Sequence, residues 1–373
     1  MQLDKIIKLL PSFLNAGIAI EIRGRSGIGK TDMLRQFVHD MNKREGSWGI
    51  GSHYAATWTP PDVTGFLMPR TAKITLDDGT VQEQMVSEWA AAPWLRADPG
   101  QEFAWLNDFE HALLVLEEFD KANPEVKKAC APLILEKGLQ GHYLHRNVGI
   151  VLLTNHADDG RQGSTKEQDF VINRKVLLNA TQSVAAWQEW AETNGVHPLF
   201  IAFATQHVEA VFGGVLPEKQ GPFCTPRSLV ALSRVAEQGL ISSDGNIADD
   251  EAFMETAQGA IGGPAARDIV TFFKFKDDVP DWTEIVQDPG KAKVPENVGG
   301  QLMVAHICAH HVDDKTCEPA VRYVRRLKKE FHITFIKAAT RRNFRLTNSK
   351  PFVKWTSEAP ELVALITALG GAR

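Results

Sequence analysis

Apolar and polar residues in the first half of the chain follow strand-type and helix-type patterns in turn. Apolar positions recur at helical spacing over residues 3–10, and Pro11 is expected to end that helix. Residues 17–24 then form a short strand pattern that runs into a glycine-rich turn. Helical periodicity returns over residues 31–45. The pattern therefore predicts a strand, a glycine-rich loop and a helix in succession.

Further strand patterns follow at intervals, and two of them are apolar without alternation. Such continuous runs are typical of parallel strands whose two faces are both covered. An Asp-Gly pair between alternating residues predicts a hairpin insertion at 74–84. The predicted strands are 52–59, 111–118, 147–155 and 174–181, with a helix at 123–138 that closes at Gly138. Strands alternating with helices predict an α/β domain with a mostly parallel sheet between helices.

From about residue 223 onward, the pattern is helical only. The Gly- and Pro-rich stretch 213–222 is the expected boundary between a core domain at 1–212 and an all-α lid domain at 223–373. A polar, Pro-rich connector is expected within the second domain at 276–300. The predicted helices include 226–239, 250–262, 265–275 and 319–331.

Composition narrows the class of protein without identifying it. The chain has 373 residues, 43% hydrophobic and 23% charged, which is the profile of a soluble globular protein. A net charge of −5 gives no global basic field for nucleic acid. We see no signal peptide and no membrane span, and the four cysteines form no CxxC pair. We therefore expect a cytoplasmic protein with reduced thiols and no membrane partner.

The stretch "GRSGIGKT" fits the phosphate-loop pattern G-x-x-x-x-G-K-[ST], and it lies between a predicted strand and a predicted helix. Its glycines permit a tight turn whose backbone N–H groups face phosphate oxygens, and the helix N-terminus favours negative charge. The lysine is expected to reach the β- and γ-phosphates, and the threonine hydroxyl to bind Mg²⁺. The loop residues are Gly24, Arg25, Ser26, Gly27, Ile28, Gly29, Lys30 and Thr31.

Polar residues end the two buried strands that follow. Glu117 and Glu118 close the first of them, and Asn155 closes the second. A phosphate-loop nucleotidase needs one carboxylate to hold Mg²⁺ and another to polarise the attacking water. We assign Glu117 to the metal and Glu118 to the water, because strand alternation sends neighbouring side chains in different directions. Asn155 is expected to contact the γ-phosphate or the water.

With these motifs in order, the chain resembles an AAA+ ATPase of the MoxR-type branch. "GRSGIGKT" is similar to the family's Walker A motif, "LLVLEEFDKANP" to Walker B and the segment after it, and "LLTN" to sensor 1. "INRKVLL" resembles the arginine-finger segment and "CTPRSL" the start of the lid. Two departures are Glu117 in place of the usual Asp, and Asn-Arg-Lys in place of Asp-Arg-Phe.

The resemblance implies ATP and Mg²⁺ as cofactors and Arg174 as a finger that acts on a neighbouring subunit. It points to Arg227 as the lid residue that reads the γ-phosphate. A finger acting in trans implies head-to-tail self-assembly, expected as a hexameric ring. It also implies chaperone-like remodelling of a protein, often with a partner that carries a von Willebrand A domain.

Several alternatives stay open. Arg161 is a rival for the finger. The basic segment 322–350, with interleaved Phe331, Phe335 and Phe344, is compatible with a nucleic-acid motor. A Glu at position 117 is compatible with a scaffold that binds nucleotide without hydrolysing it. Histidines and a cysteine at 306–317 allow a zinc site, though ordinary histidines are favoured.

Overall fold

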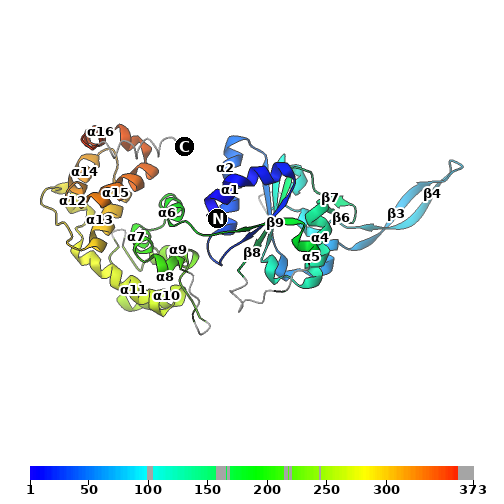
Figure 1. Cartoon of the computed structure of the whole chain (residues 1–373), viewed down its shortest axis with the longest axis horizontal. Helices are drawn as coiled ribbons and strands as arrows, with labels where there is room; N and C mark the ends of the chain where they lie inside the picture. Colours follow the sequence, from blue (N-terminus) through cyan, green and yellow to red (C-terminus); the bar gives the residue numbers. More distant parts are fainter. Residues whose placement is uncertain are drawn as a thin grey trace. The chain divides into compact units, whose positions relative to one another are not determined.

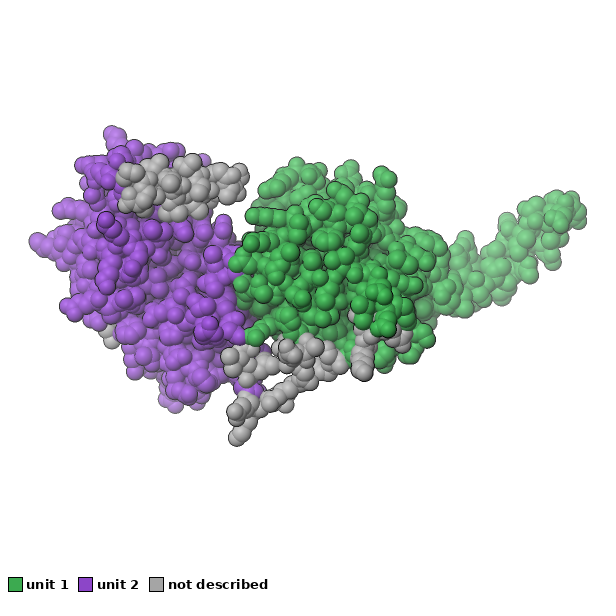
Figure 2. Space-filling model, viewed as in Figure 1, with its two compact units in different colours: residues 1–182 green, residues 183–373 purple. Residues whose placement is uncertain are grey.

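The computed structural model describes residues 1–98, 104–156, 165, 169–213, 217, 221–242 and 245–359. The chain forms two compact units, Met1–Gln182 and Ser183–Arg373 (Figure 2). The division lies earlier than the stretch 213–222 predicted from the sequence. Helices between 184 and 212, expected at the end of the core domain, belong to the second unit, because their apolar residues such as Trp187, Leu199 and Phe200 join its hydrophobic core.

The first unit is built on a five-stranded sheet in the order β2-β5-β8-β1-β9, and its neighbouring strands pair in parallel. All of β8 and most of β5 are buried, which explains their continuous apolar sequences. The predicted α/β fold, with a mostly parallel sheet between helices, is confirmed. The strands are β1 Ala19–Arg23, β2 Trp48–Tyr54, β5 His111–Glu117, β8 Val148–Thr154 and β9 Lys175–Asn179.

Helices cover both faces of this sheet. Alternate residues of β5 face opposite ways: Leu113 joins a cluster with residues of α1 and α2, and Leu114 joins another with residues of α4. The period of two along the strand thus divides the core into two layers. The helices are α1 Leu3–Ala16, α2 Lys30–Arg44, α3 Pro60–Thr64, α4 Pro124–Glu136 and α5 Asp169–Ile172.

The first helix is longer than the sequence predicted. Pro11 lies inside α1, which ends at Gly17 in the left-handed conformation (φ 69°). Pro11 removes one backbone donor, but the turns after it are held by packing. An added Cβ at Gly149 would lie 1.8 Å from Leu14 Cδ2, so Leu14 packs directly on the β8 backbone. Tertiary packing therefore overrides the proline signal.

The predicted hairpin is confirmed, and it is longer than expected. Strands β3 (Leu67–Thr75) and β4 (Val81–Trp89) pair antiparallel around a turn with Gly79 at φ 85°. Figure 1 shows this ribbon projecting away from the rest of the first unit. Its exposed apolar side chains include Met68, Val81 and Met85. A second, short hairpin pairs β6 (Gly138–Leu139) with β7 (His142–Tyr143).

The regular secondary structure of the second unit is helical in its described residues, and its buried side chains form one hydrophobic core. The predicted helix 319–331 is divided: α14 ends at Val324 and α15 begins at Lys329. Across the described ranges, no helix combines the length and apolar character needed to cross a membrane. The helices are α6 Val184–Thr193, α7 Pro198–Gln206, α8 Val208–Phe212, α9 Pro226–Ala236, α10 Asp250–Ile261, α11 Gly263–Lys274, α12 Trp282–Gln287, α13 Val298–His311, α14 Cys317–Val324, α15 Lys329–Arg342 and α16 Lys350–Ser357.

Candidate nucleotide site

The phosphate-loop sequence lies between β1 and α2, as predicted. The Gly24 N–H donates to the Thr154 carbonyl (3.1 Å), which ties the start of the loop to the end of β8. A Cβ at Gly24 would lie 2.8 Å from Ile28 Cδ1, and Gly27 and Gly29 have φ values of 76° and 87°. The first glycine thus allows close approach, and the other two allow left-handed backbone.

Lys30 is the buried cation of this loop. Its side-chain Nζ donates to the carbonyls of Gly24 (2.6 Å) and Arg25 (3.0 Å) and to Asn155 Oδ1 (3.2 Å). The ammonium group therefore bridges the loop and the end of β8. Two residues predicted to serve one site, Lys30 and Asn155, lie in direct contact although they are far apart in the sequence.

Glu117 lies at the carboxyl end of β5 and faces the loop. Its Oε2 accepts a hydrogen bond from Thr31 Oγ1 (2.8 Å). The residue is only 7% exposed, and its Oε1 is buried without a hydrogen-bond partner among the described residues. A buried carboxylate oxygen without a donor is costly unless a cation or water satisfies it. A hydroxyl oxygen and a carboxylate oxygen form a donor set that fits Mg²⁺.

Glu118 points elsewhere, and the reason differs from the one predicted. It lies beyond the strand, in the left-handed conformation (φ 52°, ψ 35°), so the backbone turns sharply between the two glutamates. Its carboxylate pairs with Lys121 Nζ (3.1 Å), and its side chain is 41% exposed. A non-glycine residue in this conformation carries strain of the kind often found at functional positions.

Asp120 was not singled out from the sequence. Its Oδ1 accepts from the backbone N–H of Asn155 (3.2 Å), and its carbonyl accepts from Lys127 Nζ (2.8 Å). It thus connects the segment after Glu118 to the end of β8. The sequence could have indicated this residue, because Asp120 follows Glu117 and Glu118 within the acidic run "EEFD".

Arg174 and the phosphate loop lie at opposite ends of the parallel strands. In the parallel pairing of β1 with β9, Ala19 is opposite Lys175 and Arg23 is opposite Asn179. Arg174 therefore precedes the amino end of β9, whereas Gly24 follows the carboxyl end of β1. With about 3.3 Å per residue, the two levels are roughly 20 Å apart. Arg174 is half-buried, with its guanidinium 5.7 Å from the ring centre of Phe170.

The structure describes one of the two other candidate arginines, Arg227 and Arg161. Arg227 is exposed near the start of α9, whose N-terminus is capped by Thr225 and Ser228. It lies in the second compact unit, and its assignment to the γ-phosphate stays a prediction. Arg161, the rival finger, lies outside the described residues.

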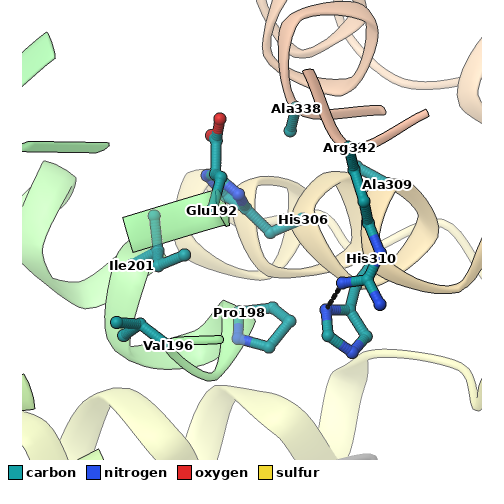
Figure 3. Close-up of a pocket in the computed structure, with 9 residues that line it drawn as sticks. All are labelled: Glu192, Val196, Pro198, Ile201, His306, Ala309, His310, Ala338 and Arg342. Atoms are coloured by element: carbon teal, nitrogen blue, oxygen red, sulfur yellow. Dashed lines mark hydrogen bonds between the residues drawn. The ribbon is translucent and has the colours of Figure 1, made fainter. Parts of the chain in front are cut away.

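A separate small cavity lies in the second unit (Figure 3). Its volume of about 20 Å³ suits one water molecule rather than a ligand. Burial lowers the pKa of His306 to about 4, and its Nε2 has no hydrogen-bond partner among the described residues. The neighbouring His310 bonds Arg342 through Nδ1 (2.6 Å). In the described part of the chain, no group of three His, Cys, Asp or Glu side chains suits a metal ion.

Of the three phenylalanines singled out in the basic segment of the second unit, two are buried and Phe344 is half-buried. Phe331 and Phe335 are buried in the core, 5% and 0% exposed. Arg341 pairs with Glu192 (3.0 Å), and Arg326 donates to the carbonyls of Pro289 and Ala292. These rings are therefore not available for stacking on bases.

Comparisons with family models and with curated protein sequences find no match. Among solved structures, NtrX from Brucella abortus is 15% identical, with a TM-score of 0.32, over 97% of this chain and 67% of that one. Drosophila ORC bound to poly(dA/dT) DNA and Cdc6 is 12% identical (TM-score 0.33), over 100% and 67%. ORC2 of Aeropyrum pernix, in ADPNP and ADP complexes, is 13% identical (TM-score 0.25), over 85% and 69%.

Similarity at this level identifies no function, so the class of the protein depends on its own geometry. A parallel sheet between helices carries a phosphate loop after β1, a buried carboxylate after β5 and an amide after β8. These features define the first unit as an α/β core with a phosphate loop.

Proposed function

We propose that the first unit binds ATP with Mg²⁺ and hydrolyses it. The observation that carries this proposal is the pair formed by Thr31 and Glu117. The threonine hydroxyl and the carboxylate are 2.8 Å apart beside the phosphate loop, and the second carboxylate oxygen is buried without a partner. Glu117 is one methylene longer than the Asp that the resemblance predicts, and its carboxylate reaches the Thr31 hydroxyl in the first turn of α2.

Each residue has a distinct role in this proposal. The backbone N–H groups of the loop and the Lys30 ammonium hold the phosphates. Thr31 and Glu117 hold Mg²⁺, which neutralises charge on the phosphate oxygens when it is bound. Glu118 polarises the attacking water, and Asn155 orients it. Because Asn155 already contacts Lys30, the residue that holds phosphate and the residue that orients water are linked before ligand binds.

We also propose that the site is completed by a second copy of the chain. Arg174 precedes the amino end of β9, roughly 20 Å from the level of the chain's own loop, by strand rise. From that end of the strands, Arg174 can contact a phosphate bound to another copy of the chain much more readily than a phosphate bound to its own loop. A head-to-tail contact of this kind closes as a ring, which we take to be a hexamer. Arg227 is assigned to the γ-phosphate from the lid.

The biological role proposed is remodelling of a partner protein, as in the MoxR-type branch that the motifs resemble. A partner with a von Willebrand A domain is part of that proposal. A nucleic-acid motor is less well supported, since the phenylalanines at 331 and 335 are in the core and several arginines of the basic segment are paired.

The test compares the full-length wild type with Glu118→Gln and Glu117→Gln. Wild type is expected to hydrolyse ATP in the presence of Mg²⁺. Glu118→Gln should bind a fluorescent ATP analogue with unchanged affinity but turn over at least about 100-fold more slowly, as expected when a general base is lost. Glu117→Gln should instead need roughly 10- to 100-fold more Mg²⁺ for the same rate. Binding without turnover in the wild type would support the scaffold alternative and contradict the proposal.

A further inference from the structure

A buried carboxylate lies in the middle of β1, one strand away from the proposed water site. Glu21 is 2% exposed. Its Oε1 accepts from Thr154 Oγ1 (2.7 Å) and from Arg23 (2.8 Å), and its Oε2 pairs with Lys175 Nζ (2.8 Å). Burial alone raises the pKa of Glu21, but Lys175, Thr154 and Arg23 together bring it below its ordinary value. The carboxylate is therefore ionised.

Lys175 is the buried partner of this carboxylate. Its side chain is 2% exposed, and its Nζ also lies 5.2 Å from the ring centre of Phe119. The ion pair thus joins β1, β9 and the turn after β5. A buried ion pair is weak evidence for stability, because desolvation offsets most of the attraction. This pair is of interest because of the residues to which it connects these three segments.

Three residues of this network are chain neighbours of residues in the proposed hydrolysis site. Thr154 precedes Asn155, Phe119 follows Glu118, and Lys175 follows Arg174. Arg174 itself is held between two anchors, since Val171 is fully buried and accepts a backbone hydrogen bond from Arg174 (3.2 Å). The arginine is therefore presented from a backbone whose place depends on Lys175.

We propose that Glu21 and Lys175 are positioning residues that fix the Arg174 segment relative to the chain's own Glu118 and Asn155. This inference rests on the proposed function, because it assigns the pair a role in presenting the finger to a neighbouring subunit. Small displacements of a positioned group carry large costs in rate. The pair is thus expected to control turnover at the neighbour's site more than nucleotide binding at its own.

The test uses a double variant, Glu21→Gln with Lys175→Met, which removes both charges and nearly preserves volume. Lys175→Met alone is unsuitable, since it leaves a buried carboxylate without its main counter-charge. The double variant should keep the wild-type thermal midpoint and the wild-type affinity for a fluorescent ATP analogue. Its kcat should fall while its KM stays unchanged.

Mixing of full-length chains separates the finger from the site that it serves. Glu118→Gln carries an intact finger and a silent site, and Arg174→Ala carries an intact site without a finger. The mixture of these two is expected to hydrolyse ATP although each is silent alone. The two substitutions Glu21→Gln and Lys175→Met are then introduced either into the Glu118→Gln chain or into the Arg174→Ala chain.

The expected result is a loss of roughly tenfold or more when the pair is neutralised on the finger-bearing chain, and a much smaller loss on the other chain. Equal losses in the two placements, or none on the finger-bearing chain, would overturn the inference. If the parent mixture is silent, the trans finger itself is wrong, and both proposals fall at that step. Should the double variant not fold, Glu21→Asp replaces it in both placements, since the shorter carboxylate keeps the charge balance of the pair but draws back from Thr154 Oγ1 and Lys175 Nζ.

Discussion

At the scale of single residues, the two adjacent glutamates show how backbone conformation assigns roles. Glu117 ends the strand and faces Thr31, whereas Glu118 is left-handed and half-exposed beside Lys121. The sequence predicted different directions for the two side chains, and the turn at Glu118 produces them. A strained residue next to a buried, partly unsatisfied carboxylate is the local feature that most distinguishes this site from an ordinary strand end.

Replacing Glu118 by Gly should separate strain from function. The Gly variant and the Gln variant should both be inactive, because neither carries a carboxylate. The Gly variant should be the more stable of the two by up to about 1 kcal/mol, since glycine adopts the left-handed conformation without a Cβ penalty. Urea unfolding followed by fluorescence measures the difference. A Gly variant clearly less stable than the Gln variant would contradict the conformation described.

His306 should make the stability of the second unit depend on pH. Burial lowers the pKa of His306 to about 4 in the folded chain, whereas the unfolded histidine takes up a proton below about pH 6.5. Between those values the unfolded state binds more protons, so the free energy of unfolding falls as the pH falls. From pH 7.5 to pH 5 this group should remove about 2 kcal/mol.

His306→Gln supplies the matched control, because it keeps a polar side chain that does not titrate. Carboxylates and the other histidines titrate in both proteins, so only the difference between the two curves reports on His306. The wild type should lose about 2 kcal/mol more than the variant over this range. Parallel curves would show that His306 is protonated equally in the folded and unfolded chains.

At the scale of elements, the sequence predicted those helices, strands and loops whose positions depend on a local residue pattern. The loop between β1 and α2 and the buried runs of β5 and β8 carry their signals within a few residues, and they lie where predicted. The continuation of α1 through Pro11 was missed, because it depends on Leu14 packing on Gly149 of a distant strand. The Glu21–Lys175 pair was missed because it requires the strand order, although a Glu inside an apolar strand was a visible signal.

The hairpin of β3 and β4 should be dispensable for the stability of the first unit. Its side chains are mostly exposed, and the hydrophobic clusters on the two sheet faces include none of them. Replacing residues 68–87 with a short Gly-containing turn keeps the hydrogen bond between His142 and the Trp89 carbonyl (2.9 Å). The free energy of unfolding should change by less than about 1 kcal/mol, since an isolated ribbon is itself marginally stable.

The same truncation also tests whether the hairpin takes part in nucleotide binding. ATP affinity should be unchanged, because the hairpin is mostly exposed and the hydrogen bonds described for Lys30 and Thr31 involve none of its residues. Thermal unfolding and binding of a fluorescent ATP analogue provide the two readouts. A large loss of stability would mean that the ribbon covers part of the core.

At the scale of the whole molecule, the account depends on where two arginines lie. The register of β1 and β9 places Arg174 at the edge opposite the phosphate loop, which no sequence pattern could reveal. Arg227 lies in the other compact unit, so its role is tested only by function. The phosphate loop, Glu117 and Glu118 lie at one end of the strands, and Arg174 lies at the other end. We therefore expect the chain to hydrolyse ATP only when it assembles with other copies of itself.

The most direct test is therefore the steady-state ATPase rate per chain, measured over a wide range of protein concentration for wild type and Arg174→Ala. We predict that the wild-type rate per chain rises with concentration and then levels off as assembly completes. The Arg174→Ala chain should bind ATP equally well and stay silent throughout. A rate per chain that is independent of concentration and unaffected by Arg174→Ala would show that each site is complete within one chain, and would contradict the account.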